Sequence, residues 1–280
     1  SRTLSSLRVV KPREEATNQA PLVIVGGGNM GAALVQGLLQ SRHPENTIAV
    51  AETSAQRRAE LAKLFPGVMV VSEVPTCREV VIAVKPADAY SAARSAVTAG
   101  AERLISIAAG VRLGALRETC GNAVRLIRAM PNTPATIGRA TTAIAASADC
   151  SAADRQWASD LLSSVGSVFE IPEAMMDAFT GLVGSGPAYL FYVAEALREA
   201  AIAEGFDPHM SSELVSNLLS GSAALLELQP ERAAELRARV TSPNGTTAAG
   251  IGTLDTHKVR EAFVAAVRSA TQRSKELGDA

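Results

Sequence analysis

Short apolar runs alternate with amphipathic stretches between residues 21 and 170 of the 280-residue chain. The run at 22–25 is continuous and precedes three glycines, a pattern typical of a strand buried on both faces. Similar runs predict further strands at 48–51, 68–71, 79–84, 103–107, 123–128 and 141–146, and helical periodicity at 30–40 and 54–64 lies between them. Strands that alternate with helices at this spacing predict an α/β fold with a doubly wound parallel sheet.

Beyond about residue 171 the strand pattern stops and only helical periodicity remains, at 172–184, 187–205, 208–228, 230–239 and 256–277. We therefore expect a dinucleotide-binding domain over 21–170 and an all-helical domain over 171–280. Several of these helices are apolar around most of their circumference, as at 190–194, which predicts burial against a second subunit. The polar segment 1–20 is expected to be a disordered extension.

Composition excludes several function classes. Hydrophobic residues make up 47% of the chain and charged ones 20%, as in globular proteins. The formal net charge of −1 provides no basic field for nucleic acid, and 4% aromatic residues provide few stacking platforms. No apolar run reaches the roughly 20 residues of a membrane helix. The expected partner is a small-molecule substrate, with neither nucleic acid nor membrane.

Cysteines and histidines are scattered. Cys77, Cys120 and Cys150 form no CxxC pair, and no cluster of histidine, cysteine and carboxylate has metal-ligand spacing. We expect no metal, and reduced thiols in a cytoplasmic protein. The Ser/Arg-rich opening is weakly similar to a transit peptide, but Glu14 and Glu15 argue against one.

A glycine-rich turn follows the first predicted strand. Gly26, Gly28 and Gly31 satisfy the pattern G-x-G-x-x-G, with Asn29 and Met30 between the second and third of them. Small glycines let the backbone approach a pyrophosphate, which lies on the free N–H groups at the start of the next helix. In this strand–turn–helix context the turn predicts a dinucleotide-binding site.

Glu52 ends the second predicted strand and precedes Thr53. An acid at this place commonly accepts hydrogen bonds from the adenine ribose hydroxyls, which favours NADH and repels a 2′-phosphate. Arg57 and Arg58 follow closely, and they either clamp that phosphate or lie solvated on a helix face. The sequence therefore leaves the choice between NADPH and NADH open.

Three further segments lie at the expected carboxyl edge of the sheet, where open α/β sheets bind ligands. The first holds Ala83, Val84, Lys85 and Pro86, and its lysine lies either beside the cofactor or extended into solvent from the strand end. Ala109 follows the next strand and leaves space for the nicotinamide. Asn132, in the rigid loop 130–134, hydrogen-bonds either an amide or its own main chain.

Two polar segments stand out in the helical half. Residues 184–189 place Ser185 as a candidate N-cap before a long apolar helix. Residues 241–247 (Thr-Ser-Pro-Asn-Gly-Thr-Thr) precede another helical stretch with several N–H groups and hydroxyls. The second segment is either a receptacle for a small carboxylate or an ordinary capped loop.

Together the segments 26–31, 83–86, 130–134, 184–189 and 241–247 resemble the pyrroline-5-carboxylate reductase family in order and spacing, across nearly the whole chain from about residue 21. The resemblance implies a Rossmann-like sheet domain followed by an all-α dimerisation domain. It implies reduction of the C=N bond of 1-pyrroline-5-carboxylate by NADPH or NADH, giving L-proline in the last step of proline biosynthesis. It also implies a homodimer, with further assembly to a decamer as an option.

The resemblance also implies roles for individual residues. The substrate carboxylate and nitrogen would lie at Ser242, Gly245, Thr246 and Thr247, with Thr247 on the nitrogen. Thr180 would assist, and Glu173 would lie near the substrate.

Three positions depart from the family pattern. Asn244 replaces a glycine, although asparagine tolerates positive φ better than most residues. Glu52–Thr53 and Arg239 also differ from the usual residues. These departures put the preference for NADPH and one inter-subunit substrate contact in doubt.

A protonated imine is already electrophilic, so its reduction needs positioning more than a strong general acid. The absence of lysine between Lys85 and Lys258 fits this chemistry and disfavours a reductase of keto or hydroxy acids. That reductase and a non-catalytic, dinucleotide-responsive scaffold are the two alternatives.

Overall fold

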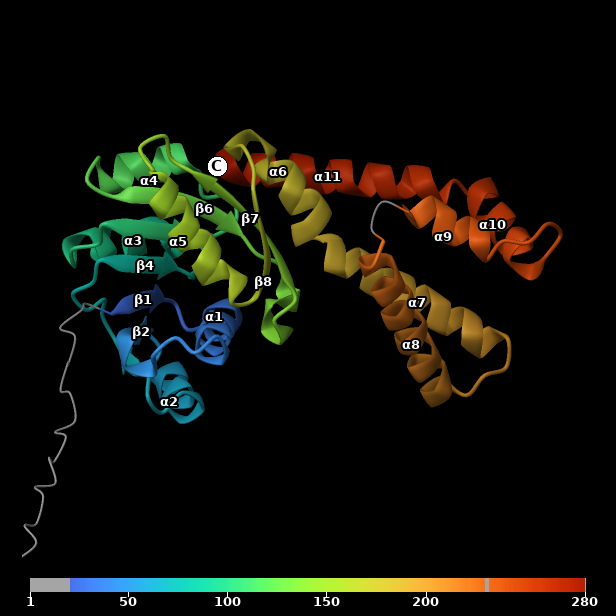
Figure 1. The fold of residues 1–280 in the computed structure, drawn as a ribbon, viewed down its shortest axis with the longest axis horizontal. Coiled ribbons are helices and arrows are strands. Elements are labelled where there is room, and N and C mark those ends of the chain that lie inside the picture. Colours follow the sequence, from blue (N-terminus) through green and yellow to red (C-terminus); the bar gives the residue numbers. More distant parts are fainter. Residues whose placement is uncertain (1–20, 230–231, 280) are drawn as a thin grey trace, which may run out of the picture.

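The computed structural model describes residues 21–229 and 232–279, and the expected extension 1–20 lies outside them. A sheet domain lies at one end, and a long helical arm reaches away from it (Figure 1). The helix that closes the chain runs back along this arm and ends beside the sheet domain (Figure 1). The arm therefore projects from one side of the sheet domain.

An eight-stranded sheet has the order β3-β2-β1-β4-β5-β6-β7-β8. Its strands are β1 Leu22–Val25, β2 Ile48–Ala51, β3 Met69–Val71, β4 Glu79–Ile82, β5 Arg103–Ser106, β6 Arg125–Met130, β7 Ala140–Ala146 and β8 Gly166–Glu170. The reversal of strand order at β1 gives the doubly wound, Rossmann-like topology that the sequence predicts. Since β1 and β4 are hydrogen-bonded neighbours, a turn after β1 lies next to the segment that follows β4.

The predicted parallel doubly wound sheet is confirmed from β3 to β6, but its far edge contains one antiparallel pairing. Strand β7 runs antiparallel to β6, and β8 runs parallel to β7. Only the short loop 131–139, which contains a 3₁₀ turn over Thr133–Ile137, joins β6 to β7. A parallel connection needs a crossover of a dozen or more residues, so this loop permits only antiparallel pairing. Strand β8 has no clear apolar run, and the sequence pattern misses it.

Helices cover both faces of the sheet. One face packs against α1 Asn29–Gln40, α2 Ala55–Leu64 and α5 Ala152–Ser163, and the other against α3 Ala89–Thr98 and α4 Leu113–Cys120. Side chains of β1 alternate between the two cores, with Ile24 in the first and Val23 in the second. This burial on both faces explains why the strands appear in sequence as unbroken apolar runs.

After β8 the described chain is helical up to residue 279. The helices are α6 Met176–Phe179, α7 Gly186–Ala203, α8 Pro208–Glu227, α9 Ala233–Arg239, α10 Thr246–Thr256 and α11 Val259–Asp279. Among the described residues no helix is both long enough and apolar enough to cross a membrane.

Ser185 lies immediately before α7, at the boundary that the sequence predicts, but it does not act as a side-chain N-cap. A π-helical turn over Thr180–Gly184 joins α6 to α7, and the N–H of Ser185 donates to the carbonyl of Thr180 at 2.9 Å. Ser185 has helical dihedral angles, and its side chain caps nothing. Wider helical hydrogen bonding accommodates the glycines here without ending the helix.

The root of the helical arm is tied to the sheet domain by polar contacts. Arg112 pairs with Asp279 at 2.8 Å, and the Ser274 hydroxyl donates to Asp177 at 2.7 Å. Arg128 of β6, with a side chain only 4% exposed, lies 3.9 Å from the same Asp177 carboxylate. Charged groups on both sides of this junction therefore hold the last turns of α11 against the sheet domain.

Candidate active site

The glycine turn between β1 and α1 is shaped by close backbone contacts. Gly26 has a φ of +104°, a region that glycine enters without strain. A Cβ at Gly26 would lie 2.6 Å from the Ala83 carbonyl oxygen, and a Cβ at Gly31 would collide with the carbonyl of Gly26. Two glycines are therefore required to fold the turn tightly against β4 and α1.

Gly28 lies on the open side of this turn. A Cβ at Gly28 would meet no atom within 4 Å, and Gly28 and Asn29 are exposed at the first turn of α1. No side chain caps the α1 N-terminus. An open, uncapped helix start after a tight glycine turn fits a dinucleotide pyrophosphate. Met30 follows as a half-buried residue in that turn.

Glu52 comes directly after β2 and points at the glycine turn. Its carboxylate accepts hydrogen bonds from the N–H of Gly27 at 2.9 Å and from the N–H of Ser54 at 2.8 Å. Thr53 beside it is exposed. The sequence expectation singled out Glu52 but missed Gly27, whose N–H fixes the carboxylate. The run of three glycines was the available signal.

The segment after β4 lies at the same edge. Ala83 donates its N–H to the Val25 carbonyl at 2.7 Å, which places the segment beside the glycine turn. Val84 is half-buried, Lys85 and Pro86 are exposed, and the Lys85 carbonyl accepts the first bond of a 3₁₀ turn. Ala109 is exposed after β5, the next strand in the sheet. These predicted residues therefore share one edge of the sheet.

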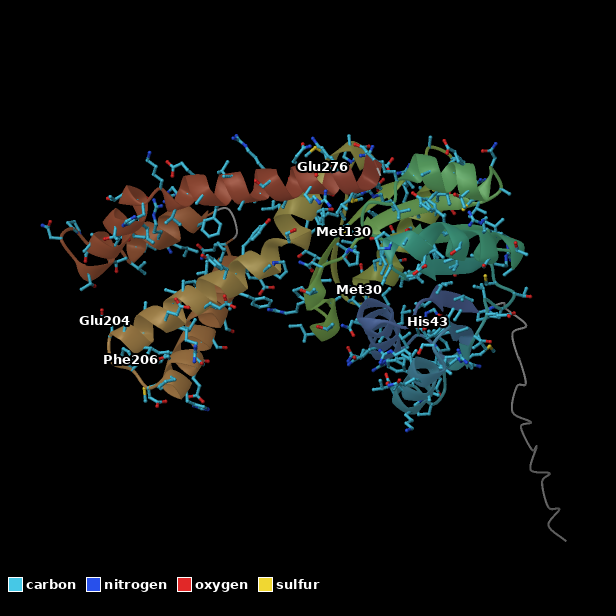
Figure 2. All side chains as sticks on the ribbon, turned by 180° about the vertical axis from the view of Figure 1, so that it is seen from behind. Met30, His43, Met130, Glu204, Phe206 and Glu276 are labelled. Atoms are coloured by element: carbon cyan, nitrogen blue, oxygen red, sulfur yellow. The ribbon has the colours of Figure 1, made fainter. Side chains whose placement is uncertain are left out.

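Asn132 links the sheet to the start of the helical arm. Its side-chain oxygen accepts the Thr141 N–H at 2.9 Å, and its amide nitrogen donates to the Val183 carbonyl at 3.3 Å. Asn132 therefore hydrogen-bonds the main chain of two other segments, not the main chain of its own loop. Figure 2 shows Met30 and Met130 on the side of the sheet domain that faces the arm.

Thr180 begins the π-helical turn near this point. Its hydroxyl donates to the Met176 carbonyl at 2.8 Å, which leaves oxygen lone pairs free to accept. A Cβ on Gly184 would lie 3.0 Å from Met130 Cε and 3.5 Å from Thr180 Cγ2. Thr180 is thus close to the carboxyl end of β6.

Glu173 has partners of its own. Its carboxylate accepts the Leu113 N–H at 2.7 Å, at the start of α4, and lies 3.4 Å from Arg128. A carboxylate at a helix N-terminus is stabilised by the unpaired N–H groups there. The structure therefore places Glu173 as a link between the arm's first turn and α4.

The loop 241–245 leads into α10 in the arm. Asn244 adopts a φ of +60°, the region that asparagine tolerates in place of glycine, and the Gly245 N–H donates to the Ser242 carbonyl at 3.0 Å. A Cβ on Gly245 would lie 2.5 Å from Ser242 Oγ. Ser242 and Thr246 are exposed, and Thr247 is half-buried. The loop therefore presents hydroxyls and first-turn N–H groups together.

This loop is remote from the glycine turn of its own chain. The C-terminal end of α11 touches the sheet domain, whereas α10 and the loop before it lie at the far end of α11 (Figure 1). A 21-residue helix such as α11 is about 30 Å long. Within one molecule, the residues predicted to bind the cofactor and those predicted to bind the substrate therefore lie far apart.

An apolar groove of 690 Å³ lies between α7 and α11, with one wall residue from α10. Its walls are formed by Tyr189, Tyr192, Val193, Ala196, Leu197, Leu254, Val259, Ala262, Phe263 and Ala266. Much of this wall is exposed, including 74% of Tyr192 and 41% of Phe263. Figure 2 labels Glu204 and Phe206 at the end of the branch that α7 and α8 form.

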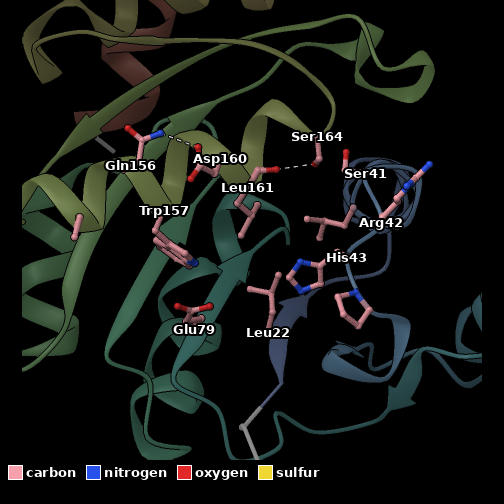
Figure 3. Close-up of a pocket in the computed structure, with 13 residues that line it drawn as sticks. Leu22, Ser41, Arg42, His43, Glu79, Gln156, Trp157, Asp160, Leu161 and Ser164 are labelled. Atoms are coloured by element: carbon pink, nitrogen blue, oxygen red, sulfur yellow. Dashed lines mark hydrogen bonds between the residues drawn. The ribbon is translucent and has the colours of Figure 1, made fainter. Parts of the chain in front are cut away.

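A second hollow, of 640 Å³, lies at the opposite edge of the sheet (Figure 3). It is lined by Leu22 and Glu79, the first residues of β1 and β4, together with His43 and Trp157. Ligands of open α/β sheets bind at the carboxyl ends of the strands, and this hollow lies at the amino ends.

Metal and thiol chemistry find no support in the described part of the chain. Residues 21–229 and 232–279 contain no group of three histidines, cysteines or carboxylates placed to hold a metal. The three cysteines are free and buried, and burial raises the pKa of Cys77 to about 11. A thiol with such a pKa is protonated at neutral pH.

The fold and the glycine turn define a protein of the Rossmann dinucleotide-binding class with an all-helical C-terminal half. Two family models agree: one described as pyrroline-5-carboxylate reductase dimerisation matches residues 173–277, and one described as NADP oxidoreductase, coenzyme F420-dependent, matches residues 21–110. Pyrroline-5-carboxylate reductase of Synechocystis sp. is 38% identical over 265 residues, covering 92% of this chain and 98% of that protein. The Mycobacterium leprae enzyme is 34% identical over 93% and 98%. The chain belongs to the pyrroline-5-carboxylate reductase family.

Solved structures are similar to this chain over nearly its whole length. A pyrroline-5-carboxylate reductase from Coxiella burnetii superposes with a TM-score of 0.86 at 30% identity, covering 93% of this chain and 99% of that one. A Plasmodium falciparum pyrroline carboxylate reductase with NADP bound gives a TM-score of 0.81 at 27% identity, covering 92% and 98%. The similarity thus extends over both the sheet domain and the arm.

Proposed function

We propose that this protein reduces the C=N bond of 1-pyrroline-5-carboxylate with NADPH or NADH, giving L-proline. The observation that carries the proposal is the loop before α10, where Asn244 keeps the left-handed turn and Ser242, Thr246 and Thr247 surround a helix N-terminus. A helix start with nearby hydroxyls is suited to a small carboxylate.

The cofactor would lie along the carboxyl edge of the sheet. Its pyrophosphate would rest on the first turn of α1, its adenine ribose at Glu52, and its nicotinamide towards β5 and β6. The residues proposed to hold it are Gly26, Gly28, Asn29, Met30, Gly31, Glu52, Thr53, Ala83, Val84, Lys85, Pro86, Ala109 and Asn132. When bound, the reduced nicotinamide supplies the hydride, and the imine nitrogen already carries the proton.

The substrate would lie between two chains. Because the loop before α10 is separated from its own glycine turn by the length of α11, we assign it to the cofactor edge of the partner subunit. The partner subunit's Ser242, Gly245 and Thr246 would bind the carboxylate. The partner subunit's Thr247 would accept a hydrogen bond from the protonated nitrogen, and catalysis would consist mainly of positioning.

Two residues near the junction have different parts in this proposal. Thr180 is half-buried close to the end of β6 and has a free lone pair, so it would assist at the substrate nitrogen. Glu173 holds the Leu113 N–H, so it would act near the substrate by positioning the segment before α4.

The working unit would be a homodimer joined through the α7–α11 groove, with further assembly to a decamer. Light scattering on the purified chain measures this directly. We place the protein in the cytoplasm, where buried, unpaired cysteines such as Cys77 and Cys120 stay reduced.

The test of the function is the loss of NAD(P)H absorbance in the presence of 1-pyrroline-5-carboxylate, run with both cofactors. Oxidation with this substrate and not with simple 2-keto acids is expected. Oxidation with keto acids alone would assign the protein to a different reductase class. No oxidation with any substrate would favour the non-catalytic scaffold.

A further inference from the structure

The carboxylate of Glu52 is held in place before any ligand arrives. It accepts hydrogen bonds from the N–H groups of Gly27 and Ser54, at 2.9 and 2.8 Å. A Cβ on Gly27 would lie 3.3 Å from Glu52 Oε2, so a glycine lets the carboxylate approach this closely. A carboxylate has about four lone-pair sites, and two stay free for the ribose hydroxyls.

The two arginines beside Glu52 are already engaged. Arg57 Nε donates to the Gly27 carbonyl at 2.7 Å, and its terminal nitrogen pairs with Glu60 at 2.8 Å. Arg58 donates from one nitrogen to the carbonyls of Glu52 and Thr53, both at 2.8 Å. These contacts hold the backbone around Glu52. Each guanidinium has five N–H groups, so these contacts direct both arginines towards the backbone without occupying every donor.

Together these contacts form a closed arrangement. Glu52 holds the Gly27 N–H, Arg57 holds the Gly27 carbonyl, and Arg58 holds the carbonyl of Glu52 itself. The carboxylate therefore cannot swing away without loosening the glycine turn. A 2′-phosphate would be placed against a fixed negative charge, whereas a ribose diol would donate two hydrogen bonds to it.

We propose that Glu52 makes this reductase selective for NADH over NADPH, and that Arg57 and Arg58 hold Glu52 in position instead of binding a 2′-phosphate. The reaction catalysed is that of the proposed function, but the selectivity concerns cofactor binding and can be measured without substrate. Binding of NADP by a relative such as the Plasmodium falciparum protein does not decide the matter, because selectivity depends on the residues after β2.

The test measures dissociation constants of NADH and NADPH for the full chain by calorimetry. NADH is expected to bind at least about tenfold more tightly, as a hydrogen-bonded diol and a repelled phosphate differ by a kcal/mol or more. The fragments adenosine 5′-monophosphate and adenosine 2′,5′-bisphosphate should show the same order. Equal or tighter binding of NADPH would overturn the proposal.

Two variants test whether the charge of the Glu52 carboxylate determines the cofactor selectivity. Glu52→Gln keeps the shape and removes the charge, so the NADH/NADPH affinity ratio should fall towards one. Glu118→Gln, an exposed acid on α4, is the matched control and should leave the ratio unchanged. An unchanged ratio in Glu52→Gln, in protein whose melting temperature is preserved, would contradict the proposal.

Arg58→Ala distinguishes the two roles of the arginines. If Arg58 positions Glu52, its loss weakens NADH at least as much as NADPH. A selective loss of NADPH binding would show a phosphate clamp instead. Because binding is measured without substrate, a protein that selects NADH but fails to reduce 1-pyrroline-5-carboxylate would refute the proposed function and leave this inference standing.

Discussion

The sheet domain buries Ile24, Ile82 and Leu104 completely, whereas the helical arm leaves 65% of Phe191 and 62% of Leu190 exposed. The sheet has helices on both faces, so each strand is enclosed by its own chain. In α7–α11 the buried residues among those described are Ser211, Val215 and Ser274. Exposed apolar surface on this scale marks an interface. One region is thus a complete core, and the other is half of a core that a second copy completes.

The residues proposed for binding are divided between the same two regions. The sheet domain holds the residues that suit a cofactor, and all of them lie at one edge of the sheet within a single chain. The arm holds the residues that suit a small acid, and they lie where they cannot reach that edge of their own chain. The two regions can therefore be tested separately, because in the proposed function cofactor binding needs one chain and turnover needs two.

The largest effect is expected from separating the chains. Phe263→Asp places an unpaired charge in the apolar α7–α11 groove, which a dimer interface cannot bury cheaply. We expect a monomer whose turnover falls by at least about a hundredfold and whose NADH affinity is kept, because burying the charge costs several kcal/mol. Light scattering, the reductase assay and calorimetry measure the three quantities.

Leu64→Asp is the matched control, since Leu64 is 60% exposed on α2 of the sheet domain. It should leave both the dimer and turnover intact. A monomeric Phe263→Asp enzyme with full activity would contradict the proposal that the active site lies between two chains.

Thr247→Ala should lower kcat by about ten- to a hundredfold, the value of one hydrogen bond to a charged group. The dissociation constant of NADH should not change, since Thr247 lies in the arm. Thr247→Ser should restore most of the rate. Thr253→Ala, further along α10, serves as the control. A loss of NADH affinity that matches the loss of turnover would contradict the role.

Gly181→Ala tests the packing inside the arm, between the π-helical turn and α11. A Cβ on Gly181 would collide with the Thr271 hydroxyl and lie 2.8 Å from the Thr271 nitrogen on α11. Overpacking of this kind costs about 1–3 kcal/mol of unfolding free energy, so the melting temperature should fall. Gly114→Ala on α4, where a Cβ meets nothing within 4 Å, should leave it unchanged or slightly higher. Equal effects of the two substitutions would argue against tight packing between the π-helical turn and α11.

The smallest expected effect is on the unfolding free energy, and it arises from Asp154 in the sheet domain. Burial by itself would raise the pKa of Asp154, but hydrogen bonds from Ser151 and the nearby Arg103 guanidinium hold that pKa below its usual range. A lowered folded-state pKa stabilises the protein above the ordinary aspartate pKa, and the benefit is lost as the pH falls through the folded-state value. Asp154 also completes the capping box at the start of α5.

Asp154→Asn should therefore lower the unfolding free energy by about 1 kcal/mol at pH 7. The difference from the unsubstituted protein should shrink below about pH 4, where ordinary aspartates take up protons. Urea denaturation at both pH values measures it, with Asp160→Asn, an exposed acid on the same helix, as the control. A difference that is the same at both pH values would show that the charge of Asp154 adds nothing.

Local signals in the sequence were enough for the sheet domain. Unbroken apolar runs predicted the strands β1 to β7, and three glycines located the tight turn between β1 and α1. The far edge was harder, because β8 is half-exposed and lacks an apolar run, and the antiparallel β7 depended on the shortness of the loop before it. The N-cap predicted at Ser185 is absent because a π-helical turn precedes α7 and keeps helical dihedral angles through Ser185, which no local sequence pattern indicates.

The sequence by itself determined the class of fold, the position of the glycine turn and the family resemblance, because these depend on the order and spacing of residues along the chain. Only the tertiary structure decided how Glu52, Arg57 and Arg58 are paired, and how far the loop before α10 lies from its own sheet. Both depend on side-chain direction and on helix length in space. Residues separated by a long rigid helix cannot meet within one chain, whatever their spacing in sequence suggests.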